Sequence, residues 1–177
     1  MAGFRADDDP RNQLFREFVD VVKRVNPKVI VFENVEGLLS YQGGQTYREV
    51  HTLFGELGYN TEGRLLVATN YAVPQKRKRV IIICTRKDLN ILPNDLYPSA
   101  ITLEEEKQVT ARETISDLEN VMCGEDAQYE DTNESDILKF FKGKLTYEEY
   151  VNLKTPIEKI ENNKIEQYEQ ISLIDLL

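Results

Sequence analysis

The pattern of hydrophobic and polar positions predicts alternating helices and strands in the first half of the chain. Residues 29–32 form a continuous apolar run that ends in a carboxylate and an amide, Glu33 and Asn34. Such a β-branched run, bounded by Pro27 and Gly37, predicts a strand buried on both faces, which is typical of a parallel sheet covered by helices. Glu33 would lie at the carboxyl end of that strand, where open α/β sheets form their ligand crevice.

Two helices are predicted around this strand. Asp9-Pro10 is typical of a helix start, and apolar residues repeat at helical spacing up to Val25. A second helix is predicted to begin at a capping box of Thr46 and Glu49 and to end at Gly58. A helix that leads into a buried strand is one half of a βαβ unit.

Two further strands are predicted over residues 64–69 and 79–85, joined by a loop over 70–78. The loop is too short for a parallel crossover, so the two strands are expected to be antiparallel. Cys84, inside the apolar second strand, is interpreted as an inert core thiol.

The second half of the chain is predicted to be mainly helical. Thr110 and Glu113 form a capping box before a short helix with Ile115 and Leu118 facing inward. An acidic linker is predicted over 124–135. Further helices are predicted over 135–142, over 146–153 with a box of Thr146 and Glu149, and from 156 towards the C-terminus.

Charge separates the two parts of the chain. The net charge of the 177 residues is −9, but residues 1–98 carry 14 Lys and Arg against 12 Asp and Glu, whereas residues 99–177 carry 8 against 19. The acidic second part argues against phosphate contact there, so the basic cluster 76–79 is the candidate for nucleic acid. The sequence has no membrane span or signal-peptide pattern, and we expect a soluble, cytoplasmic protein.

Metal and disulfide sites are not expected. The chain has two cysteines, Cys84 and Cys123, which do not make a disulfide framework. Its single histidine, His51, leaves no cluster with the spacing of metal ligands, and it is interpreted as a solvated helix residue.

Three local motifs together resemble a known family. They are the helix start Asp-Pro-Arg-Asn-Gln-Leu-Phe over 9–15, the Glu-Asn-Val over 33–35, and Pro-Gln-Lys-Arg-Lys-Arg over 74–79. In this order they resemble the DNA (cytosine-5) methyltransferases, with their Glu-Asn-Val and Gln-x-Arg-x-Arg signatures, and residues 110–118 resemble a further family segment. The resemblance covers roughly residues 1–121.

The resemblance implies that Glu33 and Arg79 are the catalytic residues. Attack on C6 of cytosine pushes electrons onto N3, so a protonated carboxyl that donates to N3 and accepts from the N4 amine makes the ring reactive. Glu33 would take this role in a dry pocket, and Arg79 would bind the cytosine O2 and add electrostatic stabilisation. The base must leave the double helix to reach such a pocket.

The resemblance also implies supporting residues and a cofactor. Asn34, Gln75 and Arg77 would bind the substrate: Asn34 holds the turn, Gln75 braces the loop, and Arg77 orients the site or touches phosphate. Leu14 would form part of the wall for S-adenosylmethionine, the methyl donor, and the substrate would be double-stranded DNA. Two structural alternatives stay open: Glu33 could cap a helix or pair with an arginine, and 76–79 could be a solvated turn.

The family pattern includes a Gly-rich cofactor segment and a Pro-Cys-Gln segment with the nucleophilic cysteine, and this sequence has neither, nor the family's C-terminal segments. Neither Cys84 nor Cys123 lies in a matching context. We therefore expect a fragment or a subunit of a split enzyme that is inactive alone, needs the missing segments or a complementing subunit, and can self-associate through exposed edges and apolar faces.

The predicted fold class is α/β, a partial Rossmann-like methyltransferase sheet with flanking helices and a mainly helical acidic tail. The expected domains are a partial catalytic domain over 1–121 and, over 122–177, a linker and the start of a variable target-recognition region. The expected function is that of a prokaryotic restriction-modification methyltransferase. The alternatives are a non-catalytic DNA- or protein-binding module derived from such an enzyme, and an unrelated α/β enzyme for small molecules.

Overall fold

The computed structural model of the chain describes residues 14–119, 121–124 and 134–154. These residues form two compact units. The first consists of described residues 14–65 and 79–97, and the second of 66–78, 98–119, 121–124 and 134–154. Within these ranges no helix is both long enough and apolar enough to cross a membrane.

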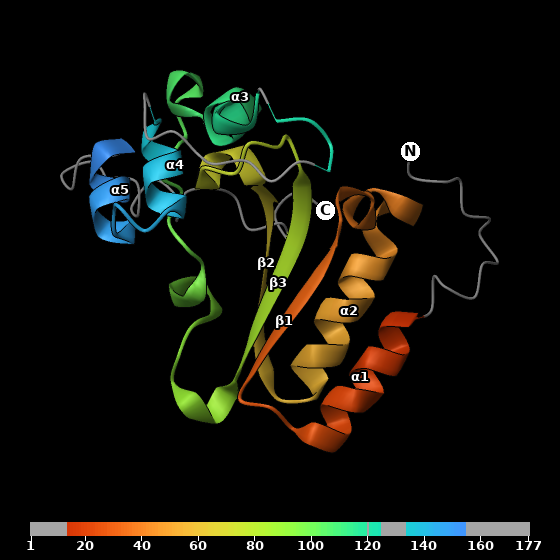
Figure 1. Cartoon of the computed structure of the whole chain (residues 1–177). Coiled ribbons are helices and arrows are strands. Elements are labelled where there is room, and N and C mark those ends of the chain that lie inside the picture. Colours follow the sequence, from red (N-terminus) through yellow and green to blue (C-terminus); the bar gives the residue numbers. More distant parts are fainter. Residues whose placement is uncertain (1–13, 120, 125–133, 155–177) are drawn as a thin grey trace. The chain divides into compact units, whose positions relative to one another are not determined.

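A three-stranded antiparallel sheet organises the first unit (Figure 1). Its strands are β1 (Val29–Val35), β2 (Tyr59–Val67) and β3 (Lys78–Arg86), in the order β1-β3-β2. In the register of β1 and β3, Val29 lies opposite Thr85 and Val35 opposite Arg79. The predicted α/β class and the antiparallel pairing of the second and third strands are confirmed.

The prediction that the first strand is buried on both faces is wrong. Ile30 and Phe32 are buried, whereas Val29, Val31 and Val35, which point to the opposite face, are 40%, 61% and 48% exposed. Among the described elements, two helices pack against one face of β1, and β1 is an edge strand paired antiparallel with β3. Continuous β-branched sequence therefore does not require burial on both faces here.

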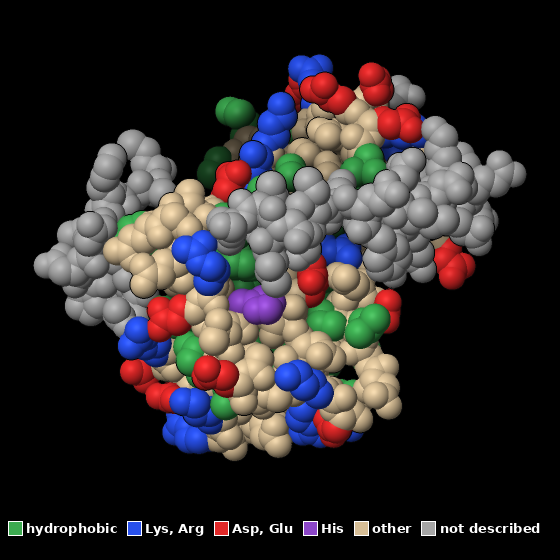
Figure 2. All heavy atoms as spheres, turned by 180° about the vertical axis from the view of Figure 1, so that it is seen from behind, with side chains coloured by type: hydrophobic (Ala, Val, Ile, Leu, Met, Phe, Trp, Pro, Cys, Tyr) green, Lys and Arg blue, Asp and Glu red, His purple; other side chains and the backbone are tan. Residues whose placement is uncertain are grey.

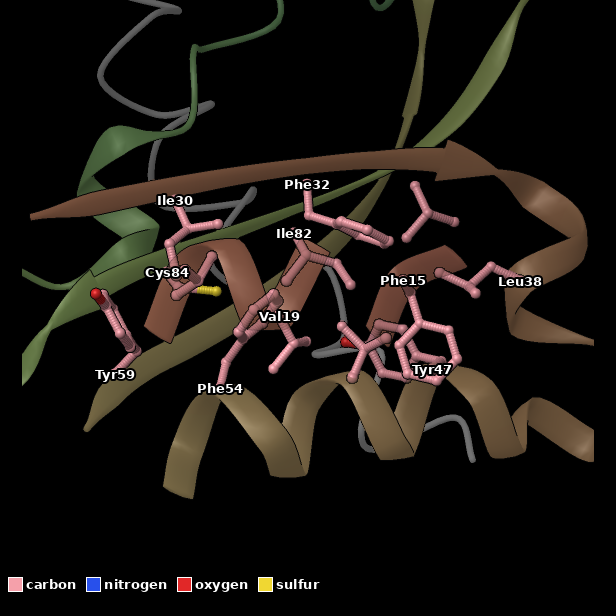
Figure 3. Close-up of a cluster of buried hydrophobic side chains, with 13 residues drawn as sticks. Phe15, Val19, Ile30, Phe32, Leu38, Tyr47, Phe54, Tyr59, Ile82 and Cys84 are labelled. Atoms are coloured by element: carbon pink, nitrogen blue, oxygen red, sulfur yellow. The ribbon is translucent and has the colours of Figure 1, made fainter. Parts of the chain in front are cut away.

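Two helices cover the inner face of the sheet, α1 (Leu14–Val25) and α2 (Gln45–Glu56). Figure 3 shows the side chains that meet between them and the strands. Phe18 packs against Phe32 of β1 with ring centroids 5.4 Å apart, and against Phe54 of α2 at 6.3 Å. The other buried members of this core are Phe15, Val19, Val22, Ile30, Leu38, Tyr47, Val50, Tyr59, Val80, Ile82 and Cys84.

The start of α2 differs from the predicted capping box. Gly44, with φ +77°, is the residue before the helix, and no side chain caps it. Glu49 instead accepts from Arg16 of α1 at 2.6 Å, so it links the two helices. The predicted end at Gly58 is confirmed, since this residue has φ +89° directly after the last turn.

The described part of the second unit contains three short α-helices, α3 (Ala111–Ile115), α4 (Asp136–Phe141) and α5 (Tyr147–Lys154). The capping box of Thr110 and Glu113 is confirmed, and the Thr146 box has the same hydrogen bonds. The core of this unit is formed by Ala72, Ile101, Val109, Ile137, Tyr150 and Val151.

Ile115 and Leu118 do not face inward as predicted, because they are 55% and 40% exposed. The helix that begins at Thr110 ends at Ile115, too soon for an amphipathic stripe to form. The helix predicted from residue 156 and most of the acidic linker lie outside the described residues.

Candidate functional site

Glu33 and Arg79 meet at the carboxyl end of β1. Arg79 Nε donates to Glu33 Oε1 at 2.7 Å. The antiparallel register explains this contact, because Arg79 lies opposite Val35 and its side chain shares a face with Glu33, two residues earlier. The Arg79 side chain is 25% exposed and that of Glu33 is 52% exposed, so solvent reaches the pair.

Asn34 fixes the backbone where β1 ends. Its Oδ1 accepts from the backbone N–H of Val35 at 2.9 Å, which is a local bond typical of asparagine at turns. The chain then enters the turn Glu36–Leu39, in which Leu38 is buried. The position of Glu33 in the strand follows from its register opposite Ile81 of β3.

Gln75 and Arg77 lie exposed in the loop between β2 and β3, within the second unit. Backbone bonds shape the loop: Ala68 N donates to Arg77 O at 2.8 Å, and Arg77 N donates to Gln75 O at 2.8 Å. A further bond runs from Gln75 N to Val73 O at 2.7 Å. The loop therefore presents both side chains from a hydrogen-bonded turn.

Thr102 is a loop-bracing residue that sequence reasoning missed. Its side chain is fully buried, and its Oγ1 accepts from Ala72 N at 3.0 Å and donates to the Thr69 carbonyl. The backbone N–H groups of Ile101 and Thr102 donate to Asn70 O at 2.9 and 3.1 Å. A lone threonine far along the chain carries no sequence signal for this contact, which only the fold creates.

Leu14 is the first described residue of α1, and its side chain is 60% exposed. Its predicted place in the wall of the S-adenosylmethionine site stays a prediction.

The two cysteines differ in environment. Cys84 is completely buried in β3, and burial raises the pKa of its thiol to about 12. Such a thiol is neutral at physiological pH, as expected for a core residue. Cys123 is exposed.

Acidic and basic side chains are interspersed on the face of the molecule that Figure 2 presents. Such mixing is typical of a solvated surface. On this face the basic residues of the chain are not separated from the acidic ones.

Comparison with known proteins matches the chain to one protein family. The family model "C-5 cytosine-specific DNA methylase" matches residues 2–177. The Type II methyltransferase M.FnuDI of Fusobacterium nucleatum is 34% identical over 167 residues, which cover 94% of this chain and 45% of the relative. M.BspRI of Lysinibacillus sphaericus is 42% identical over 120 residues, which cover 66% of this chain and 28% of the relative.

A solved structure from E. coli, described as a DNA modification methyltransferase encoded within a prophage, has a similar fold. The TM-score is 0.59 at 20% identity, over 88% of this chain and 45% of that one. The chain thus spans less than half the length of these curated relatives. The match over nearly all of its residues shows that the chain belongs to the C-5 cytosine-specific DNA methylase family.

Proposed function

We propose that the chain is the central part of a DNA cytosine-5 methyltransferase, which transfers a methyl group from S-adenosylmethionine to C5 of a cytosine flipped out of double-stranded DNA. The observation that carries this proposal is the contact of Glu33 with Arg79, at the carboxyl end of β1, in a chain of this family. A carboxyl and a guanidinium side by side can together bind one edge of a cytosine.

Glu33 would polarise the base. Its protonated carboxyl donates to N3 and accepts from the N4 amine, which also distinguishes cytosine from thymine. Arg79 would bind O2 and stabilise the charge that develops on the ring. In the chain alone the pair is solvated, so entry of the base into a covered site would exchange the ion pair for these contacts.

The remaining predicted residues would support this chemistry. Asn34 holds the turn after Glu33 through its bond to Val35 N. Gln75 braces the loop, and Arg77 orients the site or contacts a phosphate. Leu14 packs against S-adenosylmethionine, which when bound supplies the methyl group.

Catalysis would need more than this chain. The family's Gly-rich cofactor segment and Pro-Cys-Gln segment are absent from the sequence, so the missing segments or a complementing subunit would supply them. We expect the isolated chain to be inactive. Restriction-modification in a prokaryotic cytoplasm is the setting that the relatives suggest.

Methyl transfer from labelled S-adenosylmethionine to mixed-sequence DNA tests the proposal. The chain alone is compared with the chain extended upstream and downstream to the length of its relatives. The proposal is supported if the extended protein labels cytosine and the chain alone does not. If neither form transfers methyl while both bind DNA or a protein, the chain is a non-catalytic binding module, an alternative that the half-exposed, ion-paired Glu33 keeps open.

A further inference from the structure

The hydroxyl of Tyr97 joins β2 and β3. Tyr97 Oη lies 2.6 Å from Ile81 O of β3 and 2.9 Å from Glu62 O of β2. It also accepts a hydrogen bond from Ile83 N at 3.3 Å. A phenol hydroxyl carries one proton to donate and can accept as well, so this group serves backbone atoms of both strands. A residue beyond the end of β3 therefore holds the middle of that strand.

The backbone groups that Tyr97 contacts in β3 point away from β1. Arg86 N donates to Lys28 O at 3.0 Å, so the backbone groups of Arg86 point towards β1. The direction alternates from one residue to the next in an antiparallel ladder, so the groups of Ile81 and Ile83 point towards β2. The Tyr97 hydroxyl thus supports β3 from the side opposite to β1.

Ile81 connects this support to the ion pair of the candidate site. It lies directly opposite Glu33 in the register of β1 and β3, and Arg79, two residues earlier, shares its face. The contact of Arg79 Nε with Glu33 Oε1, at 2.7 Å, runs diagonally across the two strands. A displacement of β3 at Ile81 would change the length of this diagonal. The group that fixes the Ile81 carbonyl therefore also fixes the approach of the guanidinium to the carboxyl.

The ring of Tyr97 is itself held in place. Tyr97 is 8% exposed, and Arg64 Cζ of β2 lies over its ring, 4.4 Å from the centroid. Arg64 Nη2 donates to Asn94 Oδ1 at 2.9 Å, in the turn Pro93–Leu96 that directly precedes Tyr97. Burial raises the pKa of the Tyr97 hydroxyl, so the hydroxyl keeps its proton at neutral pH and can donate it.

We propose that Tyr97 is a positioning residue for the pair of Glu33 and Arg79, and that it acts through the backbone of β3 at Ile81. The inference rests on the proposed function for the reaction that the pair serves. The residues that carry it all belong to the first unit. Tyr97 holds the strand from behind, and the guanidinium and the carboxyl meet on the outer face of the sheet.

A second buried tyrosine allows a purely structural role to be distinguished. Tyr59 is 2% exposed, and its hydroxyl donates to Pro27 O at 2.7 Å. Pro27 precedes β1, so this bond lies at the opposite end of the strand from Glu33 (Figure 3). Tyr59→Phe and Tyr97→Phe remove the same chemical group from the same unit. If the Tyr97 hydroxyl only stabilised the fold, both variants would affect the ion pair alike.

NMR of the 177-residue chain tests the positioning. The readout is hydrogen exchange of the Arg79 Nε–H, which its bond to Glu33 slows. We expect Tyr97→Phe to speed this exchange about fivefold or more, because it leaves backbone groups of β3 unpaired, and Tyr59→Phe to change it by less than about twofold. In a Glu33→Gln background, where the ion pair is already lost, Tyr97→Phe should speed the exchange no further.

Circular dichroism and thermal unfolding establish that each variant is folded before exchange is measured. If Tyr97→Phe does not fold, Arg64→Met takes its place, because it keeps the hydroxyl but removes the cation over the ring. It should speed the exchange in the same direction. Exchange that neither variant alters, or that Tyr59→Phe speeds equally, would overturn the inference.

Methyl transfer by the chain extended to the length of its relatives tests the link to the reaction. We expect Tyr97→Phe to lower kcat about fivefold or more and to leave the KM for S-adenosylmethionine unchanged, whereas Tyr59→Phe changes neither. An unchanged kcat for Tyr97→Phe would overturn the inference. If the extended protein transfers no methyl while the exchange pattern is as expected, the proposed function fails and the placement of Arg79 by Tyr97 stands.

Discussion

Glu33 and Arg79 form an ion pair because of the register of two antiparallel strands. Arg79 is the residue opposite Val35, and it reaches diagonally to Glu33 on the same face. An exposed pair of this kind contributes little to stability, with typical values of about 0–1 kcal/mol. The ion pair therefore has only a minor role in stabilising the fold. The feature that suggests chemistry is the position of a carboxyl and a guanidinium at the end of a strand.

The two cysteines are predicted to differ in reactivity towards a thiol reagent at neutral pH. Cys123 is exposed and should react at once, whereas Cys84 is buried with its pKa raised to about 12 and should react only on unfolding. Titration of the native chain should therefore find one reactive thiol, and titration in denaturant two. Rapid labelling of the native Cys123→Ser variant would contradict this assignment.

At the scale of elements, the loop between β2 and β3 depends on the segment that follows Tyr97. Thr102 joins Thr69 and Ala72 through one hydroxyl, and Ala72 has the left-handed conformation, with φ +58°. The loop that carries Gln75 and Arg77 is thus fixed at its base by a buried side chain from a distant part of the sequence.

Thr102→Val should loosen this loop. The variant keeps the shape of the side chain but leaves the Ala72 N–H without its acceptor, at a cost of about 1–3 kcal/mol. We expect faster tryptic cleavage after Lys76 and Arg77 and a lower free energy of unfolding. Thr102→Ser keeps the hydroxyl and serves as the control; equal cleavage rates in the two variants would show that the hydroxyl does not brace the loop.

The segment that leads into α4 is held by charges. Glu134 accepts from Lys142 Nζ at 2.6 Å and from Lys144 Nζ at 2.8 Å, and Lys142 also contacts Asp117 at 3.3 Å. Ser135, the next residue, caps α4 by accepting from Leu138 N. These contacts tie both ends of a six-residue helix to one acidic side chain.

Glu134 should make stability depend on pH. The hydrogen bonds from Lys142 and Lys144 lower the pKa of Glu134 from its ordinary value of 4.5 to about 2. As the pH falls, the Glu134 carboxylate is therefore protonated in the unfolded chain before it is protonated in the folded chain. The contribution of Glu134 to the free energy of unfolding is fully present above pH 4.5 and is lost as the pH falls towards 2.

Urea unfolding of the chain and of Glu134→Gln, at about pH 6 and about pH 3, measures this effect. The unchanged chain should lose more stability between these values than the variant does. Glu148→Gln, which removes an equal charge from an exposed site in α5, is the control. A Glu134→Gln variant with the same pH dependence as the unchanged chain would contradict the prediction.

Local sequence predicted some of these elements and not others. The capping boxes at Thr110 and Thr146 form as predicted, because each threonine immediately precedes its helix. Thr46 matches the same pattern but lies inside α2, because the helix begins two residues earlier, after Gly44 with its positive φ. Glu49 forms an ion pair with Arg16 of α1 and does not take part in a capping box. The three threonines have the same local sequence pattern, and the surrounding fold determines which of them caps a helix.

Of the candidate site, the sequence indicated Glu33 and Arg79 because the family motifs contain them, and the structure brings these two together. The exposure of one face of β1 could not be predicted, because it depends on which elements cover the sheet. Thr102 was missed for the same reason: its partners, Thr69 and Ala72, are about thirty residues away along the chain.

At the scale of the whole molecule, the described residues form two compact units, and the three-stranded sheet organises the first of them. Among the described strands β1 lies at one edge of this sheet, and Val29, Val31 and Val35 on one of its faces are exposed. The chain also spans less than half of its curated relatives. The proposed methyl transfer is therefore tested on a chain of the relatives' length.

The most direct test of this account is methyl transfer from labelled S-adenosylmethionine to DNA by the chain extended to the length of its relatives, with and without Glu33→Gln. We predict that the Glu33→Gln variant transfers methyl about a hundredfold or more slowly, because the amide cannot donate a carboxyl proton to N3. Binding of S-adenosylmethionine should be retained. Glu36→Gln, three residues further on and exposed, should stay close to the unchanged protein. Full methyl transfer by the Glu33→Gln variant would contradict the central claim.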